Sequence, residues 1–418
     1  MTLLWMLPGV AAFRSERVLA ASAGWKHSCA LLQSSEAPFA NDFAPLQACD
    51  AELPPPDLRL RFTDRDGLVQ SLDAHSVVVF GRCPRLHVLA ARTKARVGTS
   101  VRVLRDSDTE PLTGVVTRDL AMGSRVQVTL AAGGDQVWCD VRDLRPERDG
   151  ADGAAPESAL QWEVVMPQGG LRKVCVSALL HFLYRDALPP QTSSHVGAEL
   201  VALGDALRLP RLSALALNLL PEHKRRSVAR VQGPQPEGGS ASCFAADLRR
   251  VLEQPYRHGA DAVLVLVDEA EQAHHLLVHR AVLATRSTYL RTLFGTSVGT
   301  ARRDGDGAQE LQEYTIRLSD FDLPTRFDVE TMRDIVRFCY TNGDDDAGFV
   351  TATNATGLLV ASDALMLDSL KQRCETEIEF QFLDAEVAPT LLQLCEMMGA
   401  QFAPRLALAC RRIVGSLQ

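Results

Sequence analysis

The sequence predicts an α+β protein in which small sheets are surrounded by short helices. The first observation is a change of hydrophobic period between residues 262 and 294, from the alternation of a strand hairpin to the spacing of helices. The second is that the same change recurs between residues 58 and 90. The third is size, because 418 residues with 46% hydrophobic content suffice for two to three globular domains.

The stretch from 262 to 294 predicts a hairpin followed by two short helices. Residues 262–267 and 276–278 are apolar, and the turn lies near Asp268 and Glu269. Val282 and Leu283 belong to the first helical segment. Ser287 is suited to cap the second, whose apolar positions are Tyr289, Leu290, Leu293 and Phe294.

This stretch resembles the start of a BTB/POZ domain. The resemblance rests on Asp261-Ala-Val, on the run from His279 to Leu290 and on Leu293-Phe294. It continues through three downstream segments, which are Ile316 to Asp320, Ile335 to Thr341, and Leu358 to Cys374. It implies a BTB fold over residues 243-380, in which a small sheet is surrounded by helices.

The chain carries an internal duplication of this unit. Aligning His75 with His279 and Tyr184 with Tyr340 brings the two halves into correspondence. The pairs that follow His75 without a gap include Val78 with Val282, Val79 with Leu283, Arg82 with Arg286, Leu86 with Leu290 and Leu89 with Leu293. We therefore expect two BTB/POZ folds, the first over residues 53-220.

The first copy contains an insertion at about residues 92-163. Alternating segments at 101–104, 112–117, 126–130 and 137–141 resemble a small Tudor- or SH3-like β-barrel. A Tudor methyl-lysine reader needs several aromatic faces around the cation, but only Trp138 and Trp162 are aromatic between residues 91 and 163. A structural or peptide-binding insertion is therefore the preferred interpretation.

The segments outside the two copies complete the predicted domain order. Residues 18–32 predict two strands around Gly24 and resemble one unit of the regulator of chromosome condensation repeats, so residues 1-36 are a propeller repeat remnant or an ordinary hairpin. Residues 221-242 predict a linker, and residues 381-418 predict BACK-like helices. This order resembles the BTB adaptors related to the inhibitor of Bruton tyrosine kinase.

Composition and motifs argue against several classes of function. The net charge of -8 argues against a nucleic-acid binder, which needs a basic face. Ten cysteines without a CxxC pair or a Cys/His cluster predict free thiols and no metal, and we expect no cofactor. No catalytic motif occurs and no apolar run is long enough for a membrane span, so we expect a non-enzymatic cytoplasmic protein, with the nucleus as a second location.

The resemblance implies protein partners and a set of candidate partner-binding residues. Asp261 and Arg280 take the positions of the charged pocket in BTB domains, whereas the first copy has Asp57 and Ser76 there. Leu311-Gln-Glu313 has the form of a cullin-binding motif, beside the strand that contains Tyr314. The full set is Asp261, Arg280, Tyr289, Leu293, Phe294, Leu311 and Glu313.

Two functions are consistent with these residues. The first is a substrate-recruiting adaptor of a cullin-3 type E3 ubiquitin ligase, which would bind cullin-3 and an unknown substrate protein. The alternative is a non-ligase BTB scaffold that acts by homo- or hetero-dimerisation. A His at a strand-to-helix junction is more often structural than catalytic, so His75 and His279 are expected to be buried, hydrogen-bonded residues.

Overall fold

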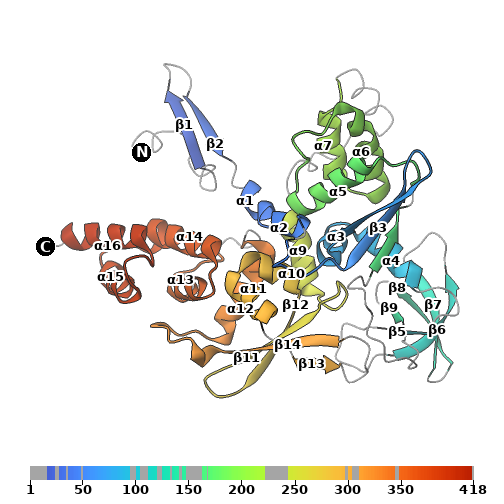
Figure 1. Cartoon of the computed structure of the whole chain (residues 1–418). Coiled ribbons are helices and arrows are strands. Elements are labelled where there is room, and N and C mark those ends of the chain that lie inside the picture. Colours follow the sequence, from blue (N-terminus) through green and yellow to red (C-terminus); the bar gives the residue numbers. More distant parts are fainter. Residues whose placement is uncertain are drawn as a thin grey trace.

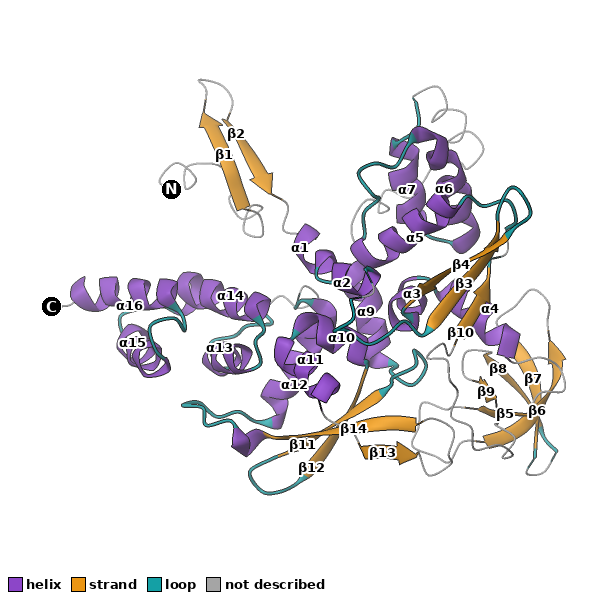
Figure 2. Ribbon diagram, viewed as in Figure 1, coloured by secondary structure: helices purple, strands orange, loops and turns teal. Residues whose placement is uncertain are grey.

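In a computed structural model, a mixed α/β chain of small sheets and short helices is described over most of its length. Figure 1 shows the arrangement of the elements, and Figure 2 shows their type. The described residues are 17–23, 28–33, 36–48, 50–94, 100–103, 112–119, 125–131, 134–140, 144–146, 162–166, 168–221, 243–296, 300–303, 310–343 and 348–416.

The first unit contains a three-stranded sheet and five helices among the described residues. The sheet order is β10-β3-β4, with β4 antiparallel and β10 parallel to β3. Its elements are β3 (Leu58–Thr63), β4 (Val69–Ala74), α3 (Ser76–Arg82), α4 (Pro84–Lys94), β10 (Trp162–Val165), α5 (Lys173–Arg185), α6 (Ser194–Leu207) and α7 (Pro210–Asn218).

The second unit follows the same order and the same pairings. Its sheet order is β12-β11-β14-β13, with β12 antiparallel and β14 parallel to β11, and β13 added at the edge. The elements are β11 (Ala262–Val267), β12 (Ala273–Val278), α10 (Arg280–Arg286), α11 (Thr288–Thr296), β13 (Thr300–Arg303), β14 (Glu310–Arg317), α12 (Val329–Thr341), α13 (Ala355–Ala364) and α14 (Asp368–Glu377). The predicted hairpin and two helices are confirmed here, and Ser287 Oγ accepts the Leu290 N–H at 3.1 Å as a cap.

The two units also share their unusual backbone conformations. A positive φ is uncommon outside glycine, so its recurrence at matching positions is a sensitive sign of a shared chain path. Every described non-glycine residue with positive φ has such a counterpart in the other unit. The pairs are Gly67 (81°) with Glu271 (59°), Asp186 (54°) with Asn342 (57°), and Arg208 (58°) with Met366 (53°).

The insertion forms a separate five-stranded antiparallel sheet. Its strands are β5 (Ser100–Val103), β6 (Leu112–Asp119), β7 (Arg125–Leu130), β8 (Gln136–Asp140) and β9 (Leu144–Pro146), in the order β8-β7-β6-β5-β9. The predicted strands are confirmed, but among the described residues β8 and β9 do not pair. The sheet is therefore open, and the expectation of a barrel is corrected to this extent.

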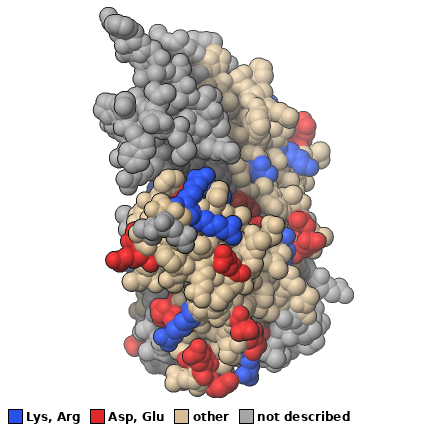
Figure 3. Space-filling model, turned by 90° about the vertical axis from the view of Figure 1, so that its left-hand side faces the viewer, with Lys and Arg blue, Asp and Glu red and all other residues tan. Residues whose placement is uncertain are grey.

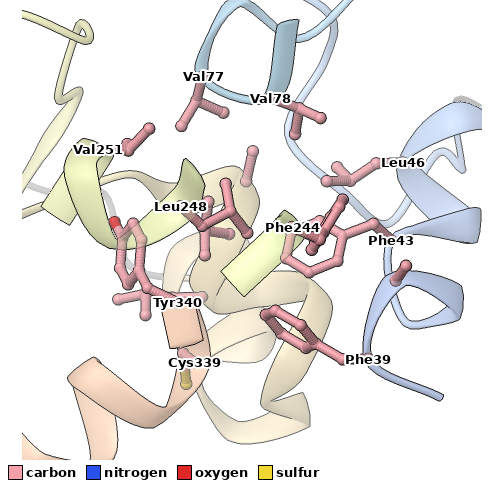
Figure 4. Close-up of a cluster of buried hydrophobic side chains, with 14 of the residues drawn as sticks. Phe39, Phe43, Leu46, Val77, Val78, Phe244, Leu248, Val251, Cys339 and Tyr340 are labelled. Carbon is pink, nitrogen blue, oxygen red and sulfur yellow. The ribbon is translucent and has the colours of Figure 1, made fainter. Parts of the chain in front are cut away.

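A short helical segment precedes each unit. We call the helices of these two segments the leading helices. The leading helices of the first unit are α1 (Glu36–Asn41) and α2 (Ala44–Gln47), and that of the second is α9 (Phe244–Glu253). α2 contacts α5 and α10, while α9 contacts α12 and α3, so each leading helix touches both units. The main core consequently runs through both units, and part of it is shown in Figure 4. Val263, Val265 and Leu311 form a separate cluster.

The two ends of the described chain lie outside this core. β1 (Arg17–Ala23) and β2 (Ser28–Gln33) form the predicted antiparallel hairpin, although Gly24 and His27 fall outside the described residues. After α14, a π-helical turn (Ile378–Phe382) leads to α15 (Val387–Met398) and α16 (Pro404–Ser416), which contact each other. None of the helices in the described ranges is both long and apolar enough to cross a membrane.

Candidate functional site

A buried histidine and a buried tyrosine hold the strand-to-helix junction in each unit. The Tyr184 hydroxyl accepts the His75 backbone N–H at 2.7 Å and lies 2.9 Å from Nδ1 of the same residue. The Tyr340 hydroxyl makes the equivalent contacts with His279, both at 2.9 Å. Burial lowers the pKa of His279 to about 4 and also lowers that of His75. Both histidines are therefore structural, as the sequence predicts.

The structure brings Asp261 and Arg280 together at the start of α10. Asp261 accepts the backbone N–H of Arg280 at 2.8 Å and its Nε–H at 2.9 Å. The guanidinium also donates to Gln312 Oε1 at 2.7 Å. About a quarter of each charged side chain is exposed, 26% for Arg280 and 28% for Asp261. The pair can therefore contact a partner.

The first unit keeps the carboxylate of this site but has no guanidinium beside it. Asp57 accepts the Ser76 backbone N–H at 2.7 Å and its hydroxyl at 2.5 Å. Burial raises the pKa of Asp57, against the effect of the Ser76 hydrogen bonds, and the negative charge of Asp261 raises it further. The two sites lie near each other at the junction of the units, since a Cβ atom at Gly259 would lie 4.0 Å from Ser76 Oγ.

Each of the three candidate residues on α11 is partly buried against the core and partly exposed. Phe294 meets Tyr314 edge-on at a ring distance of 4.8 Å, and Tyr289 packs against Phe321 at 5.5 Å. Leu293 is also packed partly against the core. Because all three keep some exposure, they can belong to a contact face, but each also stabilises the second unit.

The Leu311-Gln-Glu313 motif lies within strand β14. Leu311 is only 2% exposed and packs with Val263 and Val265 on the outer face of the sheet. Glu313 pairs with Val263 on one side and with Thr300 on the other. A buried Leu311 cannot be inserted into a partner, so the structure does not place it with the other candidates on one accessible face.

Sequence reasoning missed a second site, which is the contact between Arg82 and the leading helix of the other unit. The Arg82 guanidinium lies 4.8 Å from the ring centroids of both Phe182, in its own unit, and Phe244 on α9. It forms ion pairs with Asp186 and with Asp247 on α9, the latter at 3.3 Å. With 1% exposure, this charge is compensated entirely inside the protein.

Arg286 of the second unit makes the equivalent contact with the leading helices of the first unit. Its guanidinium lies 4.8 Å from the Phe39 ring on α1 and 4.9 Å from the Phe338 ring of its own unit. It pairs with Asp42 and donates to Asn342 Oδ1 at 2.9 Å. We name these two arrangements the arginine clamps, because each fixes an arginine between one unit and the leading helix of the other.

A repeated sequence pattern could have revealed the clamps. Phe39-Ala-Asn-Asp42-Phe43 and Phe244-Ala-Ala-Asp247-Leu248 share the Phe and the Asp that contact the two arginines. These residues surround a common cluster in which Phe39 and Phe43 each meet Phe244 edge-on, as Figure 4 shows. The leading helices are thus a third repeated element of the duplication.

The described thiols are consistent with structural roles. Cys339, Cys374, Cys395 and Cys410 are all buried on the helical faces that the sequence indicates. Burial raises the pKa of Cys339 and of Cys374 to about 12, so these thiols stay protonated at neutral pH. Within the described ranges, no group of three or more His, Cys, Asp or Glu residues could hold a metal ion.

The small sheet of the second unit, surrounded by helices, is the arrangement expected of a BTB/POZ domain. Residues 252–381 match the BTB/POZ domain family, whose members are generally non-catalytic modules of protein interaction and dimerisation. The chain therefore contains a BTB/POZ domain. The match covers less than half of the chain and excludes residues 1-36 and 53-220, so the propeller repeat, the tandem and the kinship with the inhibitor of Bruton tyrosine kinase stay predictions. No curated protein matches the chain.

Proposed function

We propose that this protein is a non-catalytic interaction adaptor in which two BTB folds pair within one chain. The observation that carries the proposal is the reciprocal pair of arginine clamps. Each clamp joins a side chain of one unit to the leading helix of the other. Such reciprocal contacts are expected of two related units arranged about an approximate twofold axis.

The assignment of the first unit to the BTB fold is supported by its detailed agreement with the second. The two units share strand order, left-handed residues and the His–Tyr contact. They also share a bond between helices: the Cys83 thiol donates to the Leu207 carbonyl at 3.8 Å, and the Ser287 hydroxyl donates to the equivalent Leu365 carbonyl at 2.7 Å.

Pairing within one chain has a functional consequence. Covalent linkage makes the association intramolecular, so the effective concentration of one unit near the other stays high when the protein is dilute. The adaptor would then present two different faces in a fixed geometry without a second copy. Its outer surface carries mixed charges, since Figure 3 shows acidic and basic side chains interspersed on the visible described face.

Sedimentation and chemical cross-linking of the full chain test the pairing. We expect a monomer in which a cross-linker joins exposed side chains of the first unit to those of the second within the same chain, at a yield that does not depend on protein concentration. Cross-links that form only between chains, together with a dimer, would overturn the proposal.

A second candidate function is the cullin-3 adaptor, which the C-terminal helices favour. α16 is held against the π-helical turn after the second unit by an Arg405–Glu379 ion pair of 3.1 Å, so a helical pair adjoins the BTB/POZ domain. The test is binding of purified full chain to cullin-3 at micromolar concentration. Failure to bind removes this candidate, and binding that survives Phe294→Ala together with Glu313→Lys rules out the α11 face as the contact.

A further inference from the structure

We propose that the pairing surface is selective, so that the leading helix of the second unit fits the first unit but rejects a second copy of its own unit. This inference rests on the proposed pairing and adds its specificity determinants. They are Gly81 on α3, Thr285 at the equivalent position on α10, and Val251 on α9. The partner that the surface accepts is therefore the first unit of the same chain.

α9 lies very close to α3 at Gly81. A Cβ atom built there would lie 2.4 Å from Cγ2 of Val251, far inside van der Waals contact. Val251 is fully buried, and a valine in a helix has one strongly preferred side-chain rotamer, so it cannot turn aside at low cost. The packing of α9 on α3 thus depends on the absence of a side chain at position 81.

The second unit has a threonine at the equivalent position. α3 and α10 are both seven-residue helices that end at the clamp arginine, which places Thr285 where Gly81 stands in the first unit. Thr285 is buried, and its hydroxyl donates to the Ala281 carbonyl at 2.6 Å. Beyond Cβ, a threonine adds two heavy atoms at the position where even Cβ is too close to Val251.

The leading helices differ in a complementary way. α9 is unbroken over its ten residues and runs closely past Gly81. The segment that faces α10 is instead divided into two helices. α1 ends at Asn41, and α2 begins at Ala44 with Pro45 in its first turn. A proline ring lacks the N–H and clashes with a continuous helix, so this segment bends where α9 runs straight. Each leading helix is therefore matched to the opposite unit.

A pair formed by two copies of the second unit would bring Val251 of each copy against Thr285 of the other. The same steric conflict would occur twice, once on each side of the twofold axis. The second unit alone therefore lacks a self-complementary surface, although it retains its own arginine, Phe338 and leading-helix Asp247. Specificity arises from a repulsive element as well as an attractive one.

The first experiment measures the steric determinant in the full chain. We expect Gly81→Ala to lower the melting temperature by about 5 °C or more, although alanine is the better helix former. Adding Val251→Ala should restore the value to that of Val251→Ala alone. The control is Gly295→Ala in α11, where a Cβ meets nothing within 4 Å and no loss is expected. The proposal is overturned if Gly81→Ala leaves the melting temperature unchanged, or if adding Val251→Ala does not remove the effect of Gly81→Ala.

The second experiment measures selectivity by sedimentation velocity. Full-chain Gly81→Thr should open the internal pair yet stay monomeric, whereas Gly81→Thr with Thr285→Gly should dimerise through two second units. A dimer of the single variant through α9, or a monomer of the double variant, overturns the selectivity. Failure of the proposed pairing would give a different result. If α9 did not pack on α3, the effects of Gly81→Ala and Val251→Ala on the melting temperature would be additive in the first experiment.

Discussion

The two units share their arginine clamps and their His–Tyr contacts, but the outer faces of their sheets differ. Both keep a buried arginine between two phenyl rings and a histidine bonded to a tyrosine hydroxyl. The outer face of the first sheet carries exposed ion pairs such as Arg59–Asp73, whereas that of the second buries Val263 and Leu311. The comparison teaches that the contacts common to both units lie inside the protein, which is the arrangement expected if the two units pair as proposed.

The largest effect is expected at the clamp of the first unit. Arg82→Met removes a charge that compensates Asp186 and Asp247 and bonds to two carbonyl groups, so we expect a loss of about 3 kcal/mol in the free energy of unfolding. Arg286→Met should cost less, because its partner Asp42 is 38% exposed and can regain water.

Denaturant unfolding of the full chain measures both losses. The matched control is Arg59→Met, which removes an arginine whose ion pair with Asp73 is 43% and 38% exposed. That change should have little effect on the free energy of unfolding, because solvent screens an exposed ion pair. Equal losses for all three variants would contradict the difference between buried clamps and surface pairs.

Acid should destabilise the second unit through His279. Its folded pKa of about 4 lies below the ordinary value of 6.5, so the unfolded chain binds a proton that the folded chain does not. Stability is therefore complete above pH 6.5 and falls by about 1.4 kcal/mol per pH unit between 6.5 and 4. His279→Gln should remove this contribution to the slope in unfolding curves recorded across that range, and an unchanged slope would contradict it.

The tyrosine hydroxyls should contribute equally in the two units. Tyr184→Phe and Tyr340→Phe each leave a buried histidine backbone N–H without its acceptor, at a cost of about 1–3 kcal/mol. Thermal unfolding of the two variants measures the costs side by side. A loss confined to Tyr340→Phe would show that the first unit does not depend on the shared contact.

The smallest effect on stability is expected at the charged site that differs between the units. Arg280→Ser gives the second unit the residue that the first has at Ser76, and the partial exposure of the Arg280–Asp261 pair limits its cost to about 1 kcal/mol or less. Denaturant unfolding measures this cost. A loss comparable to that of Arg82→Met would show that the site belongs to the core.

The sequence predicted most local elements, because hairpins and short helices follow from hydrophobic period and capping residues. Ser287 illustrates this, since a cap is a contact between near neighbours. The correspondence of local elements between the two units was visible for the same reason, because His75 and His279 precede matching helices. The resemblance placed Asp261 and Arg280 in one charged pocket, and the structure brings the two side chains together. Their role in binding a partner stays a prediction.

The missed features depend on contacts between distant parts of the chain. Arg82 and Phe244 belong to different units. The repeated Phe and Asp mark the leading helices in the sequence, but they do not show which unit each helix contacts. Leu311 was expected in an accessible motif, but pairing with β11 and β13 makes it part of an internal strand. The insertion was expected to be barrel-like. A closed barrel requires the two edge strands, β8 and β9, to pair with each other, and the hydrophobic period of the sequence does not specify that pairing.

A double-mutant cycle between Arg82 and Asp247 tests the central claim most directly. The two residues belong to different units and meet at 3.3 Å in a buried clamp. Unfolding of Arg82→Met, Asp247→Leu and the double variant in the full chain should give a coupling of about 1–3 kcal/mol that does not change with protein concentration. Additive losses, or a coupling that appears only at high concentration, would contradict pairing within one chain.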